Sequence, residues 1–338
     1  MKLDQIGFYT LTDERASQAN ESSPMWRGEI LLTDRCNYNC IYCQGLPVKN
    51  DIPFDLAIQA IDTWLADGLR NVRFSGGEPT LYRGLLALVD RCHRGGVKRI
   101  AISTNGTAPL RYYQELIDAG LDDICISLDA IVPSLAPEMA GVTNTHWERV
   151  VQNIKALSKL TYVTVSIVLT SENASNAKEI VRFSSELGVS DIRIVTASHA
   201  HQDIVNAIAD IEQEVLDAYP ILKYRIQNYL KGWNARGIRE GDAHRCHLVK
   251  DDCVIAGEWH YPCGVYLRER GAPIGVINPK MRNERITWLR THDTHEDAIC
   301  RQYCSDIYVE YNNRCEFMNQ MNNGVRFLSP LLINQQVP

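Results

Sequence analysis

Three cysteines in the first part of the chain have a spacing that suits a metal centre. Cys36, Cys40 and Cys43 form a C-x3-C-x2-C motif within eight residues. Thiolates are the usual ligands of iron–sulfur clusters, and short spacings let one loop wrap around one cluster. Three thiolates would leave one iron of a four-iron cluster open to a substrate or cofactor, as in catalytic zinc sites. By spacing alone, a partial zinc site or three unrelated thiols remain alternatives.

A second motif lies beyond the next apolar run, residues 72–74. Gly76, Gly77, Glu78 and Pro79 precede a predicted helix. Together with the cysteine motif, this GGEP sequence resembles the radical S-adenosylmethionine (SAM) superfamily, most closely its molybdenum-cofactor and peptide-modifying branches. The resemblance runs from about residue 28 to about residue 198. Two further landmarks follow the third and fourth predicted strands: Ser103-Thr104-Asn105-Gly106 and Ser127-Leu128-Asp129.

The resemblance implies two cofactors and a reaction type. Cys36, Cys40 and Cys43 would hold a [4Fe–4S] cluster, whose open iron would be chelated by the amino and carboxylate groups of SAM. An electron from the cluster would cleave SAM to a 5'-deoxyadenosyl radical, which abstracts a substrate hydrogen. In such enzymes the cofactors carry the difficult chemistry, and the protein orients them and excludes side reactions. Tyr42 matches the aromatic residue that the family places near the adenine.

Each residue of the GGEP sequence has an expected role in SAM binding. Gly76 and Gly77 lack a Cβ and would let the backbone approach the methionine amine closely. Glu78 would add an acceptor, and Pro79 would stiffen the turn.

Polar residues at the predicted strand ends are further candidates for contact with SAM. Such residues often only cap helices or turns, so both interpretations stay open. His199 and His201 follow the sixth predicted strand and could act as acid–base groups. The candidates for the ribose or the methionine carboxylate are Ser103, Asn105, Ser127 and Asp129, with Ser166 in the fifth strand as a weaker one.

The C-terminal third contains a second group of cysteines. Cys246, Cys263, Cys300 and Cys304 resemble the ligands of the twitch or SPASM extension of radical SAM enzymes, and we expect them to hold one auxiliary [4Fe–4S] cluster. The match is partial, because the C-x2-C-x5-C-x3-C run of a full SPASM pattern is missing. A structural zinc site is the alternative. Cys253 and Cys315 are substitute ligands or, in an epimerase, thiol hydrogen donors.

Composition narrows the class of protein. The chain has 338 residues, of which 45% are hydrophobic and 22% charged, as in ordinary globular proteins. A net charge of −6 argues against nucleic acid as a partner, since phosphate binding needs clustered Lys and Arg. No apolar run approaches the roughly 20 residues that span a membrane. No signal-peptide pattern is visible, which predicts a cytoplasmic protein whose cysteines bind metal rather than form disulfides.

Helical and strand patterns alternate through the first two thirds of the chain. Six such units predict an α/β fold, a partial (β/α)6 TIM-like barrel with a parallel sheet and outer helices. A small C-terminal cysteine-rich α+β domain would follow. All SAM motifs follow predicted strands, where parallel α/β folds gather ligands. The predicted parts are a lead-in covering one edge of the barrel (1–28), the barrel (29–198), a helical bridge (199–245) and the auxiliary-cluster domain (246–338).

Three functions compete on the sequence alone. The first is a radical SAM enzyme that oxidises or rearranges a small metabolite in a biosynthetic pathway, with the auxiliary cluster taking up the substrate electron. The second is a radical SAM enzyme that cross-links or epimerises a ribosomal peptide. Either would need an external electron donor such as flavodoxin or ferredoxin. The third is an iron–sulfur redox sensor or carrier, which would leave the SAM motifs without a role.

Overall fold

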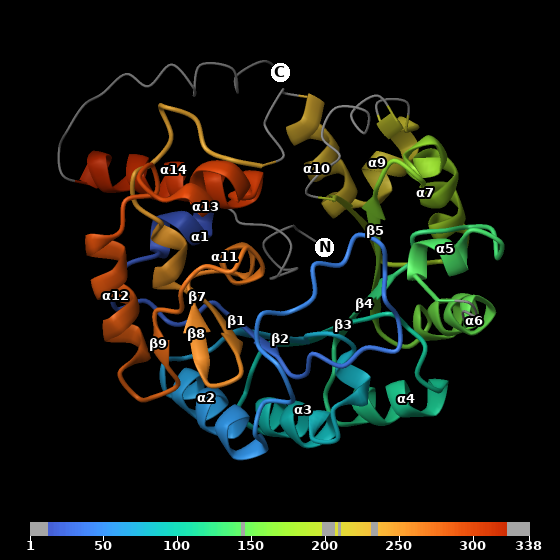
Figure 1. The fold of residues 1–338 in the computed structure, drawn as a ribbon, viewed down its shortest axis with the longest axis horizontal. Coiled ribbons are helices and arrows are strands. Elements are labelled where there is room, and N and C mark those ends of the chain that lie inside the picture. Colours follow the sequence, from blue (N-terminus) through green and yellow to red (C-terminus); the bar gives the residue numbers. More distant parts are fainter. Residues whose placement is uncertain (1–12, 143–145, 198–206, 209–210, 231–235, 323–338) are drawn as a thin grey trace.

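The computed structural model describes residues 13–142, 146–197, 207–208, 211–230 and 236–322 (Figure 1). His199 and His201 lie outside the described residues. The elements of the first half are α1 (Asp13–Gln18), β1 (Arg27–Leu31), α2 (Phe54–Ala66), β2 (Asn71–Ser75), η2 (Pro79–Leu81), α3 (Leu85–Arg94), β3 (Arg99–Thr104), α4 (Leu110–Asp118), β4 (Asp123–Ser127), α5 (Ala136–Ala140), α6 (Trp147–Leu157) and β5 (Tyr162–Leu169). Those of the second half are η3 (Ala174–Asn176), α7 (Ala177–Glu186), β6 (Asp191–Thr196), α9 (Gln213–Ala218), α10 (Pro220–Leu230), η4 (His247–Lys250), β7 (Asp252–Ala256), β8 (Trp259–Tyr261), α11 (Gly264–Arg268), β9 (Gly275–Val276), α12 (Met281–Thr291), α13 (Ala298–Tyr303) and α14 (Asp306–Asn322).

One sheet runs through the whole molecule. Strands β1 to β6 lie side by side in chain order and are parallel, with α2, α3, α4, α6 and α7 on the outside (Figure 1). This confirms the predicted partial barrel. On its other side, β1 pairs in parallel with β7, and β8 and β9 continue the sheet in antiparallel order. The C-terminal region is therefore joined to the barrel by strand pairing.

The two faces of the sheet differ in character. Residues that face the helices are apolar, such as Ile30, Phe74 and Ile102, and they belong to one large core. Side chains alternate along a strand, so the intervening residues face the inside of the barrel. Glu29 and Arg73 are among these and stand opposite each other in register. Helix packing thus stabilises one face and leaves a polar lumen on the other.

Some elements differ from the sequence-based prediction. The helical bridge is interrupted at Pro220: α9 ends at Ala218 and Pro220 begins α10, a position that suits proline because its missing N–H needs no partner there. Within the bridge, Ile208 and Ile211 are buried. Strands β7 and β8 form a hairpin around Gly257, and β7 also pairs with β1, a contact that the sequence analysis does not predict.

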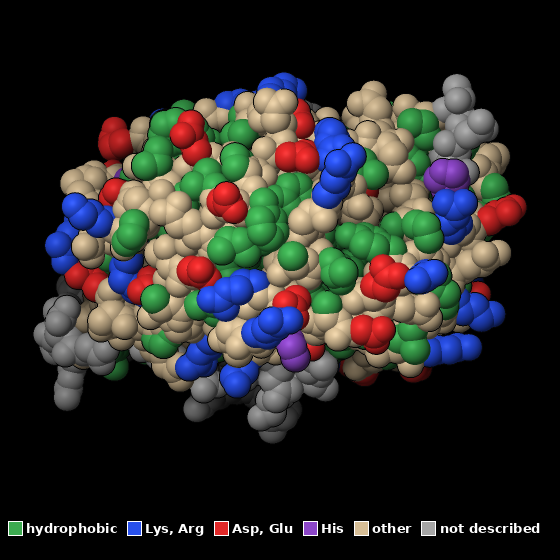
Figure 2. Space-filling model, turned by 90° about the horizontal axis from the view of Figure 1, so that it is seen from below, with side chains coloured by type: hydrophobic (Ala, Val, Ile, Leu, Met, Phe, Trp, Pro, Cys, Tyr) green, Lys and Arg blue, Asp and Glu red, His purple; other side chains and the backbone are tan. Residues whose placement is uncertain are grey.

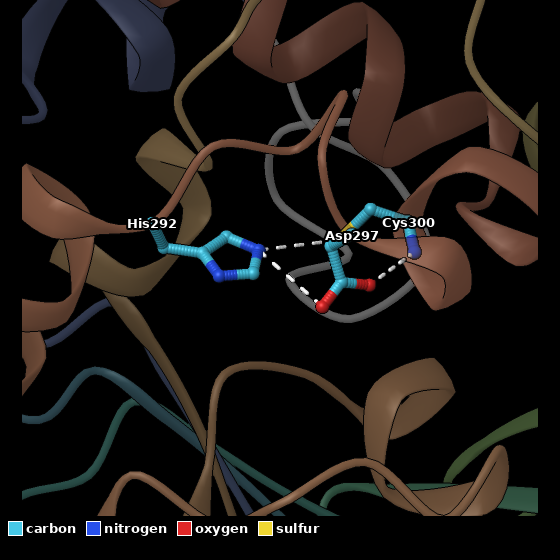
Figure 3. Close-up of side chains that lie close together, drawn as sticks. All are labelled: His292, Asp297 and Cys300. Carbon is cyan, nitrogen blue, oxygen red and sulfur yellow. Dashed lines mark hydrogen bonds and ion pairs between the residues drawn. The ribbon is translucent and has the colours of Figure 1, made fainter.

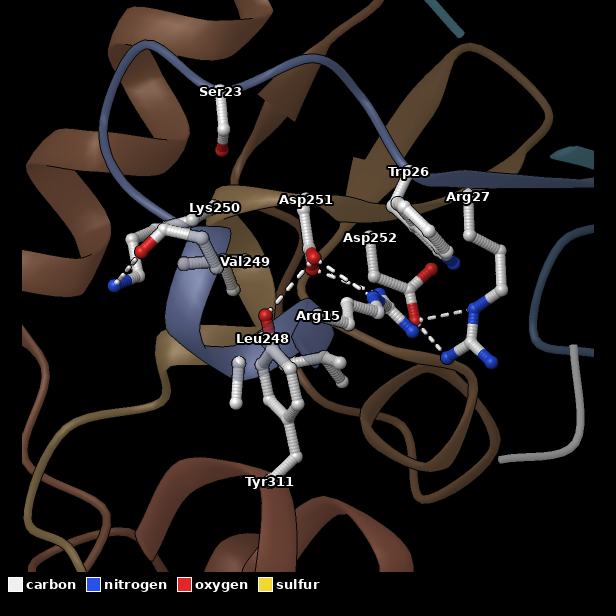
Figure 4. A network of polar contacts seen from close by, with 12 residues as sticks. Arg15, Ser23, Trp26, Arg27, Leu248, Val249, Lys250, Asp251, Asp252 and Tyr311 are labelled. Atoms are coloured by element: carbon white, nitrogen blue, oxygen red, sulfur yellow. Dashed lines mark hydrogen bonds and ion pairs between the residues drawn. The ribbon is translucent and has the colours of Figure 1, made fainter. Parts of the chain in front are cut away.

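The N-terminal helix α1 is anchored by a buried ion pair. Arg15 donates from Nε and Nη2 to both oxygens of Asp251 at 2.8 Å, and the hydroxyl of Tyr311 donates to the same carboxylate at 2.9 Å (Figure 4). The backbone carbonyl of Asp251 also accepts from the N–H groups of Trp26 and Arg27, at the start of β1. We expected the lead-in to cover an edge of the barrel. Instead, α1 packs against η4 and α14 of the C-terminal region.

The surface carries mixed side chains. Figure 2 shows the face seen from below Figure 1, where hydrophobic side chains lie between Lys, Arg, Asp and Glu. On α2 and α3, Phe54 is 42% exposed and Leu86 is 38% exposed. Within the part of the chain that the structure describes, no helix is long and apolar enough to cross a membrane.

Breaking the Arg15–Asp251 pair should destabilise the protein strongly. Both side chains are almost fully buried, at 2% and 3% exposure, so Arg15→Ala would strand a carboxylate away from water. We expect a loss of about 3–5 kcal/mol in unfolding free energy, measured by urea denaturation. Arg94→Ala is the control, because its pair with Asp90 is exposed and should contribute only about 0.3–0.5 kcal/mol. A loss in Arg15→Ala no larger than in the control would contradict this account.

Candidate functional site

The predicted cluster loop follows β1 at the open end of the barrel. Cys36 and Cys43 are exposed and Cys40 is partly buried, which raises the pKa of its thiol to about 11. The backbone N–H of Tyr38 donates to Cys36 Sγ and that of Gly45 donates to Cys43 Sγ, each at 3.4 Å. Such donors stabilise the thiolate form that an iron cluster needs. The loop therefore fits the [4Fe–4S] cluster predicted for it.

Helix α5, which the sequence did not reveal, supports this loop from the side. The N–H of Asn39 donates to Ala140 O at 2.9 Å, and that of Ile41 donates to Met139 O at 3.2 Å. Gly141 ends the helix with a φ of +61°, and a Cβ there would lie 1.9 Å from Asn39 O. The contact between loop and helix thus requires glycine.

Gly76 and Gly77 are needed for backbone packing. A Cβ on Gly76 would lie 2.5 Å from Thr33 O, and a Cβ on Gly77 would lie 2.3 Å from Arg35 O. The N–H of Gly77 donates to Thr33 O at 2.7 Å, and the next N–H, of Glu78, donates to Arg35 O at 2.8 Å. The two glycines hold the cysteine loop against the end of β2. A Cβ on Gly76 or Gly77 would point at the backbone of the cysteine loop and not into an open ligand site.

Glu78 joins the ends of β2 and β3. It is 1% exposed, and its Oε1 accepts from Thr80 N, Thr80 Oγ1 and Thr104 Oγ1 at 2.7–3.0 Å. Its Oε2 accepts from Asn105 N at 2.7 Å. Burial raises the pKa of this carboxyl group, and the four donors oppose the rise. Pro79 is buried as the first residue of η2, which Glu78 caps. Glu78 therefore positions strand ends.

A network of amides connects the cysteine loop to β3. Asn105 Nδ2 donates to Asn37 Oδ1 at 2.7 Å and lies 4.0 Å from Cys36 Sγ. Asn37 Nδ2 donates to Thr107 Oγ1 at 2.9 Å, and that hydroxyl donates to Asn105 Oδ1 at 2.7 Å. The sequence singled out Asn105 but missed Asn37 and Thr107. The position of Asn37 inside the cysteine motif was the available signal.

Tyr42 and Asp129 meet across the mouth of the barrel. The Tyr42 hydroxyl donates to Asp129 Oδ2, and Asp129 Oδ1 accepts from Val168 N at 2.7 Å. Burial raises the pKa of Asp129 to about 6, and these two donors oppose the rise. Two residues predicted to contact SAM are thus brought together, and each fixes the other's position.

The three predicted serines lie on neighbouring strands. Ser127 and Ser166 are opposite in the β4–β5 register, and Ser103 lies opposite Cys125 on the other side of β4. Their sequence neighbours are in the helix-side core, so these hydroxyls face the lumen. The Ser103 and Thr164 hydroxyls are buried and have no hydrogen-bond partner among the described residues. Buried hydroxyls normally have partners, so this wall suits a polar ligand such as SAM.

The four predicted auxiliary cysteines line a single cavity. Cys263 caps α11, Cys300 lies in α13, Cys304 ends that helix, and Cys246 precedes η4. Burial raises the pKa of Cys246 to about 12 and of Cys263 to about 11. Burial also raises the pKa of Cys300 and Cys304, and neighbouring thiols raise it further. Thiols gathered in this way ionise when a metal centre compensates their charge.

The four cavity thiols are not gathered as tightly as the ligands of a single zinc ion. With Zn–S bonds of about 2.3 Å, a tetrahedral site brings its sulfurs within about 3.8 Å of one another. Among the described residues, only His292, Asp297 and Cys300 form a group of three or more metal-ligand types whose ligand atoms all lie within 4.8 Å (Figure 3). No three of the four cavity cysteines form such a group.

A buried positive charge lies beside this cavity. Arg285 in α12 is 1% exposed and donates to Val249 O at 3.1 and 2.8 Å and to Tyr261 O at 3.2 Å. Its hydrogen-bond partners among the described residues are thus neutral carbonyls. Burial raises the pKa of Cys246, and the charge of Arg285 is one of the influences that oppose this. A buried cation calls for a nearby anion, which thiolates around a metal centre would supply.

The two candidate hydrogen donors lie away from the barrel mouth. Cys253 in β7 is 0% exposed and belongs to the core on the helix side of the sheet. Cys315 is buried in α14, where its thiol lies 3.7 Å from Ala16 O. Neither side chain faces the cysteine cavity or the lumen. The structure therefore does not support them as donors or substitute ligands.

Comparison with known proteins agrees with the barrel geometry. Residues 30–184 match the family model of the Radical SAM superfamily. The chain contains a radical SAM domain. Enzymes of this superfamily use a [4Fe–4S] cluster and SAM.

The curated relatives match part of this chain. A probable GTP 3',8-cyclase of Metallosphaera sedula is 30% identical over 179 residues, covering 49% of this chain and 54% of that protein. The GTP 3',8-cyclase of Rhizobium leguminosarum bv. trifolii is 26% identical over 269 residues, covering 75% of this chain and 68% of that protein. The chain spans about half the length of the Metallosphaera protein and of the probable GTP 3',8-cyclases of Sulfolobus acidocaldarius and Sulfurisphaera tokodaii.

Solved radical SAM structures share the fold over more of the chain. Streptococcus suis SuiB bound to the precursor peptide SuiA has a TM-score of 0.57 and 17% identity, covering 79% of this chain and 65% of that one. Native anSMEcpe with bound AdoMet has a TM-score of 0.58 and 13% identity, covering 89% of this chain and 100% of that one. At these identities the likeness establishes the fold.

The glycine contact makes a sharp prediction for cluster binding. In Gly77→Ala the new Cβ would collide with Arg35 O, so the loop of Cys36, Cys40 and Cys43 must move. We expect the variant to lose the iron of this loop after anaerobic reconstitution, about four per chain. The control is Gly241→Ala, whose Cβ would have no neighbour within 4 Å. Full iron content in Gly77→Ala would contradict the assigned role of the glycine.

Proposed function

We propose that this chain is a radical SAM enzyme with two four-iron clusters, which oxidises or rearranges a small polar metabolite. The observation that carries the proposal is the cavity in which Cys246, Cys263, Cys300 and Cys304 come together. These thiols come from segments up to 58 residues apart, since Cys246 and Cys304 are separated by 304 − 246 positions. Four scattered thiols in one buried place are unusual for a protein without a metal centre there.

The residues of the barrel mouth would hold the first cluster and SAM. When bound, these cofactors supply a 5'-deoxyadenosyl radical that abstracts a substrate hydrogen. The N–H groups of Tyr38 and Gly45 would stabilise the ligating thiolates. Tyr42, held by Asp129, would lie against the adenine, and Ser103 with its unpartnered hydroxyl would bind a polar group of SAM. The reductant would be an external electron donor of the flavodoxin or ferredoxin type.

The charges of the lumen support a polar or charged substrate. Burial alone would raise the pKa of Glu29, but Arg73 and Arg268 lower it, so this carboxylate stays charged between two cations. The ion pair of Arg27 with Asp252 lies on the same inner side, between β1 and β7. A lumen with fixed charges stabilises polar or anionic ligands. The relatives named GTP 3',8-cyclase are in keeping with such a substrate, although they match only in part.

A ribosomal peptide is the second candidate substrate. Its support is the fold shared with SuiB in complex with SuiA and with anSMEcpe in complex with the Cp18Cys peptide. In this version the enzyme would cross-link or epimerise the peptide. Because Cys253 and Cys315 are buried away from the lumen, an epimerase would need another hydrogen donor.

Turnover in D2O separates oxidation from epimerisation. Dehydrogenation removes hydrogen from the substrate carbon, so we expect no solvent deuterium on carbon in the product by mass spectrometry. Epimerisation requires a returned hydrogen from an exchangeable donor and would add one deuterium. Turnover of the same substrate in H2O gives the reference mass. A product carrying one carbon-bound deuterium would count against the oxidative version.

Iron content tests the two-cluster proposal directly. After anaerobic reconstitution we expect about eight irons per chain in the wild type. The combined Cys36→Ala, Cys40→Ala, Cys43→Ala variant and the combined Cys246→Ala, Cys300→Ala variant should each retain about four. Iron and sulfide analysis checks this.

Cys315→Ala is the matched control, because this thiol is buried outside the cavity; it should retain all eight irons. About four irons in the wild type, falling to none in the Cys36/Cys40/Cys43 variant, would remove the auxiliary cluster from the proposal. The oxidative mechanism would then lose its electron acceptor.

A further inference from the structure

His292 lies directly beside one of the four cavity thiols. Its Nε2 is 3.7 Å from Cys300 Sγ, a distance within reach of an N–H···S hydrogen bond because sulfur is a large atom (Figure 3). The same nitrogen is 3.9 Å from Asp297 Oδ2. The histidine follows α12, while Asp297 caps the N-terminus of α13 by accepting from Cys300 N at 2.8 Å. The three residues therefore hold the ends of two helices together at the cavity.

The His292 ring is held in place by aromatic neighbours. Trp288, one helical turn earlier, stacks on it with a centroid separation of 3.9 Å and an interplanar angle of 15°. Tyr266 meets the ring edge-on at 6.2 Å. The Tyr266 hydroxyl donates to Asp297 Oδ2 at 2.9 Å, which fixes the carboxylate as well. A ring fixed in this way is preorganised to keep one nitrogen pointed at the sulfur.

The neighbours of Nε2 decide which nitrogen carries the proton. Asp297 Oδ2 already accepts from Tyr266, so it remains an acceptor toward His292. Cys300 Sγ, once a thiolate ligand, is also an acceptor. A bare Nε2 lone pair would be repelled by both groups. The neutral ring therefore carries its hydrogen on Nε2, in position to donate to the sulfur.

We propose that His292 is a positioning residue that donates from Nε2 to the Cys300 thiolate and raises the reduction potential of the auxiliary cluster. The inference rests on the proposed function, since it assumes a cluster at Cys300. Reduction adds negative charge to a cluster, and a hydrogen bond to a ligating sulfur stabilises that charge. An acceptor of the substrate electron needs a potential that favours reduction. His292 would supply this without binding iron.

The test uses the full chain with Cys36, Cys40 and Cys43 changed to Ala, so that only auxiliary iron contributes. His292→Phe removes the donor and keeps a ring that can stack on Trp288. We expect about four irons in this variant, as in its parent. Its midpoint potential in an EPR-monitored redox titration should shift to a more negative value. His292→Gln restores an N–H donor and should return the potential toward that of the parent.

The possible outcomes separate the two proposals. No iron in the parent would refute the auxiliary cluster, and with it the proposed function. Normal iron with an unchanged potential in His292→Phe would overturn the hydrogen bond alone. Loss of iron in His292→Phe, with iron retained in His292→Gln, would make the residue necessary for assembly rather than for the potential. Loss of iron in both variants would indicate that His292 is a ligand of the cluster. Each of these two patterns of iron loss would also overturn the inference that His292 tunes the potential.

Discussion

The structure depends on how closely the chain can approach itself where β1 and β2 end. Thr33 O accepts from Gly77 N at 2.7 Å, and no side chain fits between the two segments. This contact fixes the direction in which the cysteine loop leaves β1. The buried carboxylate of Glu78, the next residue, accepts hydrogen bonds from Thr104 and Asn105 and so positions the end of β3 as well. The cluster loop and the strand ends are thus positioned by one connected set of contacts.

Strand β1 positions the second site as well. On one side it pairs with β2, which carries the GGEP sequence, and on the other with β7, which leads into the hairpin that ends at Cys263. The two groups of cysteines are far apart in the chain but share this strand as a common support. The buried pair of Arg15 with Asp251 strengthens the same region, because the carbonyl of Asp251 accepts from the N–H groups that begin β1. The N-terminal helix thereby stabilises both parts.

Local signals in the sequence were enough to predict the barrel but not its closest contacts. Apolar periodicity and terminal glycines, such as Gly68 after α2, predict each element from neighbouring residues. The pairing of β7 with β1 joins residues more than 200 positions apart, and no local pattern encodes it. The same holds for Gly76 and Gly77. The sequence predicted that these glycines allow a close approach of the backbone, but not that they approach the carbonyl oxygens of Thr33 and Arg35. No sequence pattern pointed to Arg285 or His292, because the roles of these residues depend on how the helices pack.

The wall between lumen and cavity bears on the proposed oxidative function. Tyr308 lines the cysteine cavity, and the guanidinium of Arg27 lies over its ring at 6.0 Å. Arg27 belongs to the inner face of β1 and pairs with Asp252 of β7. Tyr308 and the Arg27–Asp252 pair therefore belong to the wall between the two spaces. An acceptor of the substrate electron has to lie close to the substrate, whereas a purely structural metal centre does not. This shared wall supports the proposal that an auxiliary cluster in the cavity accepts the substrate electron.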